Sequence, residues 1–320
     1  MSYNKPIGGF FELELPLNPG VNTITKSGAI MLNSGRGALE LVLRVRQPSV
    51  VYVPYFTCDV VLQPLKRHNI AHTFYSVNEQ LEIIDPIDLK PDEMLIYTNY
   101  YGIKTEYAKQ LSERYGEQLI YDCSQAFFAA PLPGSHSFYS PRKFFGLPDG
   151  GLLYSPSVST IELEKDTSYN RSMHLLQRLD IGPEQSYQIF KNNDESLSSE
   201  PVKMMSNLTT TLLESIDFEA VKDIRNTNFS TLDTGLGKKN LLNVPSNPLA
   251  PLCYPFWGTK ELRDKLIEQK IFVAMYWPNV IEWVKTDTVE YQLAQNIIPL
   301  PIDQRYREEE MLRIIEVINA

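Results

Sequence analysis

Short apolar runs alternate with amphipathic segments through the first half of the chain. The runs SVVYVP, MLIYT and QLIYD combine β-branched and aromatic residues, as is typical of buried strands. Between the last two, KTEYAKQLSERYG places its apolar side chains at helical spacing. Strands that alternate with helices predict an α/β fold, in which a mainly parallel central sheet lies inside a three-layer α/β/α large domain.

The pattern changes after residue 155. Residues 156 to 200 lose periodicity and include KNNDESLSSEP, which predicts an irregular, lid-like segment between two lobes. Residues 206–232 regain helical spacing and predict one long connecting helix. The remaining residues predict a smaller α+β C-terminal domain, with strands in PLCYPFW, IFVAMYW and IIPLPID and helices in TKELRDKLIEQK and EEEMLRIIEVIN. We therefore expect a large domain at 1–200, wrapped by residues 1–30, and a small domain at 201–320.

Composition excludes several classes of protein. The 320 residues are 43% hydrophobic and 22% charged, as in ordinary globular chains. A net charge of −9 argues against general nucleic-acid binding. No apolar run is long enough to span a membrane, and the N-terminus lacks the pattern of a signal peptide. The three cysteines show no metal-ligand spacing, so we expect no metal site and a reduced, cytoplasmic environment.

An acid and a lysine in residues 121–151 suggest chemistry. Asp122 ends the QLIYD strand, and the carboxyl ends of strands are where open α/β sheets bind ligands. Lys143 lies among aromatic residues, where desolvation would favour its neutral, nucleophilic amine. Such a pair suits pyridoxal phosphate, whose aldehyde binds lysine and whose pyridinium nitrogen pairs with a carboxylate. The alternative is an exposed acid at a strand end and a surface lysine.

A glycine-rich turn precedes the first predicted helix. Ser34, Gly35, Arg36 and Gly37 lead into an apolar helical face that starts at Ala38. Glycine permits close backbone approach, and the free N–H groups of a helix start attract an anion such as phosphate. Arg36 could add a charge-assisted contact. Plain helix capping is the alternative interpretation.

Taken together, these motifs resemble the DegT-type (DegT/DnrJ/StrS-like) nucleotide-sugar aminotransferases, which are fold-type I pyridoxal-phosphate enzymes. The resemblance covers residues 31–155 and rests on NSGRGAL, VPYFTCDVV, YDCSQAF and SFYSPRKFFGLPDGG. It implies that Lys143 binds the cofactor covalently, Asp122 partners the ring nitrogen and Gln125 lies near the ring hydroxyl. It assigns the phosphate to Ser34, Gly35, Arg36 and a serine before the lysine, for which both Ser137 and Ser140 are candidates.

The sequence departs from that family at three places. Cys58 stands where an aromatic residue commonly stacks on the cofactor ring, unless Tyr55 or Phe56 turns inward. The usual histidine before the lysine is replaced by Tyr139 or Ser140. The Asn-Tyr-Arg arm that reaches the partner subunit's phosphate has no clear match near residues 203–206. We expect cofactor binding to survive these changes, whereas substrate choice need not follow the family.

The resemblance implies an aminotransferase that moves an amino group from an amino acid, glutamate by analogy, to a keto-sugar. The sugar is expected to be nucleotide-linked and to belong to surface-polysaccharide or amino-sugar biosynthesis, and the working unit to be a homodimer. One alternative is a sugar dehydratase, although those enzymes commonly replace the lysine with histidine. Another is a non-catalytic regulatory protein that binds the cofactor or a sugar.

Overall fold

A seven-stranded sheet forms the centre of the protein. The computed structural model describes residues 12–16, 28–158 and 162–320. The strands are β1 (Ile30–Leu32), β2 (Val50–Pro54), β3 (Ala71–Tyr75), β4 (Glu93–Thr98), β5 (Leu119–Asp122), β6 (His136–Tyr139) and β7 (Gly151–Tyr154), in the order β1-β7-β6-β5-β4-β2-β3. Strands β2 to β6 pair in parallel, whereas β7 is antiparallel to both β6 and β1. The predicted mainly parallel sheet is confirmed.

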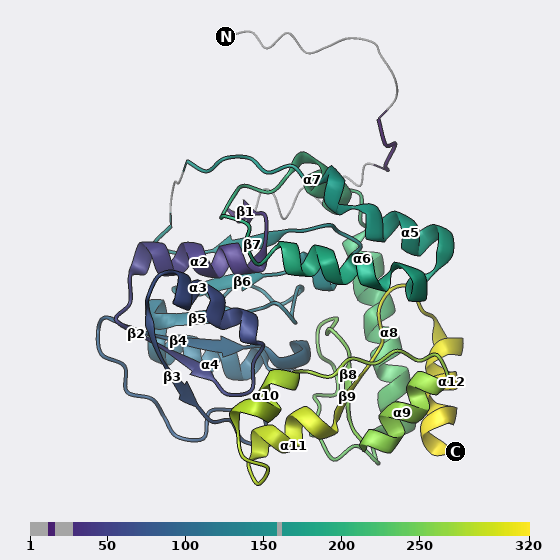
Figure 1. Cartoon of the computed structure of the whole chain (residues 1–320). Coiled ribbons are helices and arrows are strands. Elements are labelled where there is room, and N and C mark those ends of the chain that lie inside the picture. Colours follow the sequence, from purple (N-terminus) through teal and green to yellow (C-terminus); the bar gives the residue numbers. More distant parts are fainter. Residues whose placement is uncertain (1–11, 17–27, 159–161) are drawn as a thin grey trace.

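Helices cover both faces of this sheet (Figure 1). Alternate residues of β4 point to opposite sides, so Met94 and Ile96 join one buried cluster while Leu95 and Tyr97 join the other. The first cluster contains the apolar faces of α2 (Gly35–Arg46) and α3 (Leu62–Arg67). The second contains that of α4 (Thr105–Tyr115). Both sides of β4 are apolar because both sides are covered, which gives the predicted three layers.

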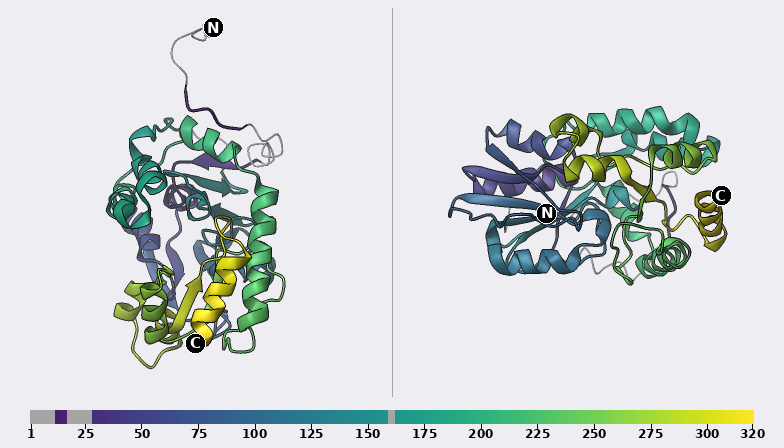
Figure 2. Two further views of the ribbon diagram at one scale, coloured as in Figure 1. Left: turned by 90° about the vertical axis from the view of Figure 1, so that its right-hand side faces the viewer. Right: turned by 90° about the horizontal axis from the view of Figure 1, so that it is seen from below.

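A second, two-stranded sheet lies in the C-terminal part of the chain. Strands β8 (Tyr254–Trp257) and β9 (Ile297–Leu300) pair antiparallel. Helix α12 packs beside α8 (Phe218–Leu236) and α9 (Figure 2). The helices here are α9 (Lys260–Glu268), α10 (Pro278–Trp283), α11 (Val289–Asn296) and α12 (Glu308–Asn319). The predicted strand IFVAMYW is wrong, because residues 271–277 form no strand and use buried Ile271 and Trp277 for packing instead.

The segment predicted to separate two lobes is more regular than its sequence suggested. Residues 156–200 contain α5 (Met173–Ile181) and α6 (Pro183–Ser196), so the prediction of an irregular segment is wrong. These helices pack against each other. Leu176 and Leu179 point outward, the latter with 86% of its surface exposed, while His174 is buried. Apolar residues on the outer side obscure the single apolar stripe by which an amphipathic helix is recognised.

The predicted long connecting helix is two helices. Helix α7 (Asn207–Glu214) ends before Ser215, and α8 (Phe218–Leu236) begins after Asp217. The Asp217 side chain accepts a hydrogen bond from the N–H of Ala220 at 3.0 Å, which caps the second helix. Local capping therefore outweighs a helical spacing that continues across the break.

Two further predictions meet the limits of the described chain. The wrapping segment predicted at 1–30 falls largely on residues 1–11 and 17–27, which lie outside the described residues. The division predicted at residue 200 lies between α6 and α7, and it stays a prediction. In the part of the chain that the structure describes, no helix is both long and apolar enough to cross a bilayer.

Candidate active site

Asp122 is a buried acid that forms no ion pair among the described residues. It is the last residue of β5, beside Thr98 of β4, and only 4% of its surface is exposed. Its Oδ1 accepts a hydrogen bond from the Ser124 N–H at 2.8 Å. Burial raises the pKa of Asp122, while the positive charge of Lys143 and the hydrogen bond from Ser124 oppose the shift. A desolvated carboxylate of this kind favours a cationic partner, such as a protonated ring nitrogen.

Lys143 lies at the end of a short 3-10 turn, Pro141–Lys143, that follows β6. The expectation that aromatic neighbours desolvate it is wrong, because Lys143 is exposed. The turn sends Phe144 and Phe145 into the core and leaves the lysine on the open side. The Lys143 Nζ donates a hydrogen bond to the Ser124 Oγ at 3.2 Å. Ser124 therefore contacts both Lys143 and Asp122.

Gln125 provides an unused donor on the same loop. The side chain is fully buried, and its Oε1 accepts a hydrogen bond from the Tyr101 N–H at 2.6 Å. Its Nε2 is also buried but has no hydrogen-bond partner among the described residues. Orphaned buried amide groups are rare, so this one calls for a ligand or a bound water.

The start of α2 brings Ser34 and Arg36 together in a cluster of polar groups that we call the polar corner. The Ser34 Oγ accepts a hydrogen bond from the Gly37 N–H at 2.9 Å, so the predicted turn is also a helix cap. Arg36 has two buried guanidinium nitrogens, Nε and Nη1, with no hydrogen-bond partner in the described chain. Burial lowers the pKa of Arg36. The negative charge of Asp194 opposes this shift, and the positive charge of Arg142 increases it. An anion at this helix start would satisfy the free donors.

The structure separates the two serine candidates. Ser137 is fully buried in β6, where its Oγ accepts a hydrogen bond from the Leu132 N–H at 3.0 Å. Ser140 instead lies against the α2 turn, because a Cβ at Gly35 would come within 3.2 Å of the Ser140 Cβ. Only Ser140 is thus brought together with Gly35 and Arg36.

The glycine pair after the lysine packs directly on the α2 turn. The Gly150 N–H donates to the Asn33 carbonyl at 2.8 Å. A Cβ at Gly151 would lie 2.2 Å from the Ser34 carbonyl oxygen, which no side chain can tolerate. This close approach requires glycine at position 151, whereas the positive φ of 121° favours glycine at position 150.

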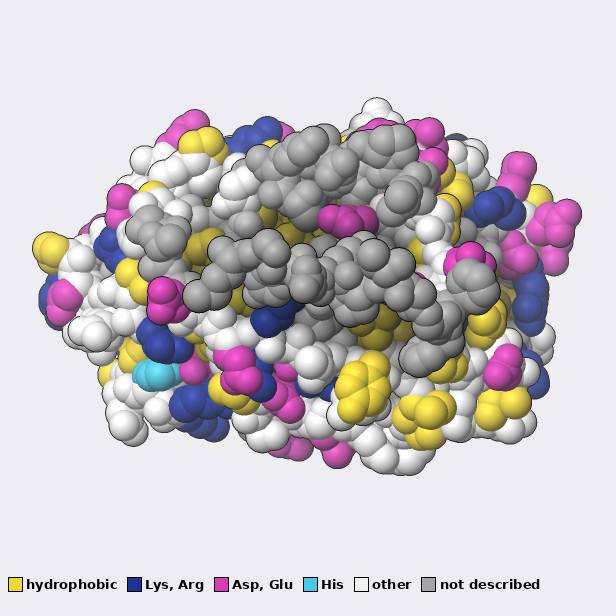
Figure 3. All heavy atoms as spheres, turned by 90° about the horizontal axis from the view of Figure 1, so that it is seen from above, with side chains coloured by type: hydrophobic (Ala, Val, Ile, Leu, Met, Phe, Trp, Pro, Cys, Tyr) yellow, Lys and Arg dark blue, Asp and Glu magenta, His cyan; other side chains and the backbone are white. Residues whose placement is uncertain are grey.

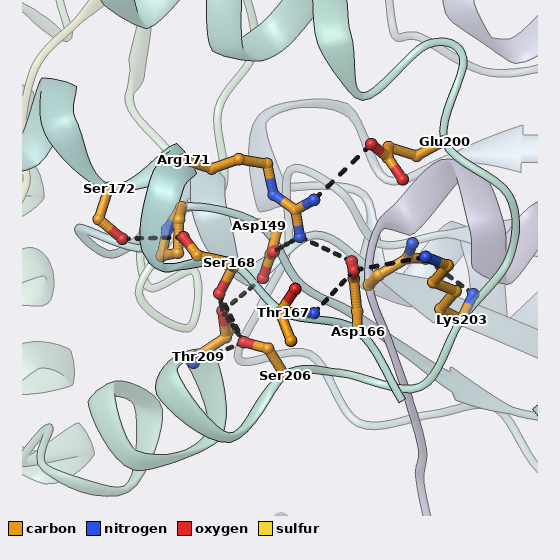
Figure 4. A network of polar contacts seen from close by, with 12 residues as sticks. Asp149, Asp166, Thr167, Ser168, Arg171, Ser172, Glu200, Lys203, Ser206 and Thr209 are labelled. Carbon is orange, nitrogen blue, oxygen red and sulfur yellow. Dashed lines mark hydrogen bonds and ion pairs between the residues drawn. The ribbon is translucent and has the colours of Figure 1, made fainter. Parts of the chain in front are cut away.

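A charged network, missed by the sequence analysis, holds the same glycine turn (Figure 4). The Arg171 Nη2 contacts an oxygen of Asp149 at 2.5 Å and one of Asp166 at 2.6 Å. Thr209 also donates to Asp149. Burial raises the pKa of Asp149, opposed by these two donors. An acid directly before Gly-Gly was the only available signal, since its partners lie up to 60 residues away.

Cys58 remains the side chain that stands in place of a stacking aromatic. Phe56 is buried against Tyr100 and Trp277, with ring centroids 5.4 and 5.1 Å apart. Tyr55 stacks on Phe74 at 4.7 Å. Neither ring is therefore free to turn inward. Burial raises the pKa of the half-buried Cys58 thiol, and the positive charge of Lys143 opposes the shift, so the thiol lies within the field of the lysine.

Residues 203–206 contact other segments of the same chain. Met204 bridges both Leu32 of β1 and Lys165, and the Ser206 side chain caps α7. As for metals, the described residues contain no group of three or more His, Cys, Asp or Glu side chains able to hold an ion.

The donors and acceptors found here fit pyridoxal phosphate. Within the described residues, Asp122 forms no ion pair, the Gln125 Nε2 has no acceptor, and two guanidinium nitrogens of Arg36 have no hydrogen-bond partner. A pyridinium nitrogen, a ring hydroxyl and a phosphate would supply these three partners. Lys143 is exposed beside them and free to bond an aldehyde.

Comparisons with known proteins agree with this arrangement at the level of the fold. No profile of a known protein family matches the sequence, and no curated protein matches it significantly. Solved structures of sugar aminotransferases do match. They include a DegT DnrJ EryC1 StrS aminotransferase from Brucella abortus, with 16% identity and a TM-score of 0.60 over 95% of this chain and 91% of that chain. The chain shares their fold.

Two further matches record ligands. DesI, crystallised in the presence of its TDP-sugar product, has 13% identity and a TM-score of 0.66 over 95% of this chain and 85% of its own. NtdA from Bacillus subtilis, with bound cofactor PMP, has 14% identity and a TM-score of 0.58 over 91% of this chain and 73% of its own. The resemblance inferred from the sequence motifs is thus confirmed for the fold, which is that of fold-type I aminotransferases.

Proposed function

We propose that this protein is a pyridoxal-phosphate-dependent aminotransferase acting on a keto-sugar. The observation that supports it most directly is the contact of Ser124 with both Lys143 and the buried, unpaired Asp122. A lysine and a carboxylate held by one residue at the carboxyl end of a parallel sheet can serve two ends of one cofactor. The shared fold supports the same proposal.

Each residue then has a defined task. Lys143 would hold the cofactor covalently, and its free amine would carry a proton to or from the substrate carbon. Asp122 would partner the ring nitrogen, and the Gln125 Nε2 would donate to the ring hydroxyl. Arg36, Ser140 and the α2 start would bind the phosphate. When bound, the cofactor supplies an electron sink for the bonding electrons of that carbon.

The sugar is proposed to be nucleotide-linked. Support comes from DesI, which was crystallised with a TDP-sugar product and has the same fold. The amino donor is proposed to be an amino acid, glutamate by family resemblance, and the pathway surface-polysaccharide or amino-sugar biosynthesis. The three cysteines are free thiols, which supports the proposed cytoplasmic setting.

Two alternatives make different predictions. A sugar dehydratase of this fold would commonly carry histidine in place of Lys143, so the lysine favours amino transfer. The presence of Cys58, where the family commonly has a stacking aromatic residue, favours instead a non-catalytic binding protein that has lost turnover. That protein would bind the cofactor but transfer no amino group.

The deciding experiment is borohydride reduction of the protein loaded with pyridoxal phosphate, followed by peptide mapping. We expect the adduct on Lys143 and its loss in Lys143→Ala. The control Lys109→Ala should retain the adduct, because Lys109 pairs with Glu106 on the exposed side of α4. Loaded protein should then convert glutamate to its keto acid in a half-reaction. An adduct on another lysine would refute the site, and an adduct without the half-reaction would favour the binding protein.

We propose a homodimer as the working unit. Helices α5 and α6 expose several large apolar side chains, and Figure 3 shows hydrophobic side chains at the surface on the side where these helices lie. The set comprises Met173, Leu176, Leu179, Ile181, Tyr187 and Phe190. We call it the α5–α6 patch. Contiguous exposed apolar surface is typical of an interface, and most homo-oligomers are two-fold dimers.

A further inference from the structure

Arg142, directly before the candidate cofactor lysine, has unused binding capacity. Its side chain is only 15% exposed, and its Nη2 pairs with the more exposed carboxylate of Asp194 on α6. The guanidinium also lies 5.8 Å from the ring centroid of Phe190. Its Nη1 is buried and has no hydrogen-bond partner in the described part of the chain. One of its two terminal nitrogens is therefore available to a ligand.

Arg142 belongs to the same polar corner as the α2 start. It follows Ser140 by two residues, and Ser140 lies against Gly35. Arg142 pairs with Asp194, and the charges of both groups act on Arg36, as does that of Arg67. Together the two arginines have three buried nitrogens without a partner in the described residues, namely Arg36 Nε, Arg36 Nη1 and Arg142 Nη1.

The charges in this corner do not balance. Arg142 pairs with the largely exposed carboxylate of Asp194, whereas Arg36 forms no ion pair among the described residues. The nearby Arg67 has its own partner, Glu40. Like charges in a partly desolvated site repel each other, and buried N–H donors without an acceptor add a further cost in free energy. A phosphate dianion that took the place of the Asp194 carboxylate would balance the two guanidinium charges and offer several acceptors at once.

We propose that Arg142 is a second phosphate-binding arginine, and that Asp194 is an internal counter-ion which the phosphate replaces at Arg142. This inference rests on the proposed function. Arg36 and Arg142 of one chain would then both bind the phosphate.

The test compares pyridoxal phosphate with pyridoxal, which lacks the phosphate, by absorbance titration of each variant. The ratio of the two dissociation constants isolates the contribution of the phosphate. We expect Arg142→Gln to lower this preference for the phosphate form about tenfold or more, and Arg142→Lys to restore part of it. Asp194→Asn should increase the preference, because it removes the competing carboxylate. Arg46→Gln, at the far end of α2, is the matched control.

The outcomes separate this inference from the function beneath it. If wild-type protein forms the adduct on Lys143 while Arg142→Gln keeps the full preference for phosphate, the inference alone is overturned. Equal weakening of both ligands by Arg142→Gln would mean a structural role and would overturn it as well. A decrease in the preference with Asp194→Asn would refute the counter-ion role. If wild-type protein binds neither ligand covalently, the proposed function itself fails.

Discussion

The Nζ of Lys143 donates a hydrogen bond to the Oγ of Ser124 at 3.2 Å, across 19 residues of sequence. The same serine donates its backbone N–H to Asp122. A lysine from the end of β6 and an acid from the end of β5 are therefore linked through one residue. The parallel pairing of these strands brings their carboxyl ends to the same edge of the sheet.

Replacing Ser124 should affect proton transfer more than cofactor attachment. In Ser124→Ala the Lys143 amine loses the acceptor that orients it, while the backbone N–H to Asp122 remains. We expect the borohydride adduct to persist and kcat to fall about tenfold, with a shift of its pH profile. The control is Ser112→Ala. Ser112 lies in α4, and its hydroxyl pairs with that of Ser135. An unchanged pH profile would rule out the orienting role of Ser124.

Asp122→Asn should separate stability from activity. Burial raises the pKa of Asp122, so the folded state holds its proton more tightly than the unfolded state does. The ionised acid consequently costs stability as the pH rises above the ordinary value of 3.8. We expect the cofactor-free variant to be more stable than wild type at neutral pH in urea unfolding. Turnover should fall by about a hundredfold or more, because the ring nitrogen loses its counter-ion. Near-normal turnover would show that another group fills this role.

Gly151→Ala should disrupt the polar corner at α2. The new methyl group would meet the Ser34 carbonyl at 2.2 Å, so the turn and the helix start must separate. We expect a loss of several kcal/mol of unfolding free energy or failure to fold, measured by thermal denaturation. Gly146→Ala is the matched control in the same loop, since its nearest neighbour would be a Leu175 methyl group at 3.8 Å. Equal stability of the two variants would contradict the close approach.

The central sheet could be predicted because its signals are local. Strands such as LIYD are apolar on both faces, and the helix between β4 and β5 has a clear amphipathic pattern. The α5–α6 segment could not be predicted in the same way. Its helices expose Leu176 and Leu179, so no single apolar stripe distinguishes them from a loop.

The candidate site shows the same division between local and distant information. Asp122, Gln125, Arg36 and Lys143 were recognisable from short motifs. The burial of Lys143 was misjudged, because adjacent aromatic residues on a tight turn point away from it. Asp194 and Arg171 contact the site region from distant segments, the former 52 residues beyond Arg142. Nothing in the local sequence of either residue signals such a contact.

His136 should make stability depend on pH below neutrality. Burial lowers its pKa from 6.5 to about 4. The unfolded chain thus binds the proton more readily, and stability present above pH 6.5 is lost as the pH falls toward 4. The loss attributable to this group is on the order of 3 kcal/mol. In His136→Gln, unfolding free energies measured from pH 7 to pH 4 should fall less steeply than in wild type. Equal slopes in the two proteins would refute the assignment.

The last prediction concerns assembly through the α5–α6 patch. Leu179 is 86% exposed, more than an apolar side chain of this size favours on an isolated surface. If two copies pair through this patch, a charge there must be buried without a partner. We expect sedimentation to show a dimer for wild type and a shift toward monomer for Leu179→Glu.

Leu241→Glu provides the control, because Leu241 is 79% exposed but lies in the loop after α8, outside the patch. It should leave the dimer intact. Titration with the cofactor then tests whether assembly matters for the site. Since Arg36 and Arg142 are proposed to hold the phosphate within one chain, monomeric Leu179→Glu should still form the adduct on Lys143. A dimer that survives Leu179→Glu would exclude the α5–α6 patch as the interface, and a fully active wild-type monomer would refute the dimer itself.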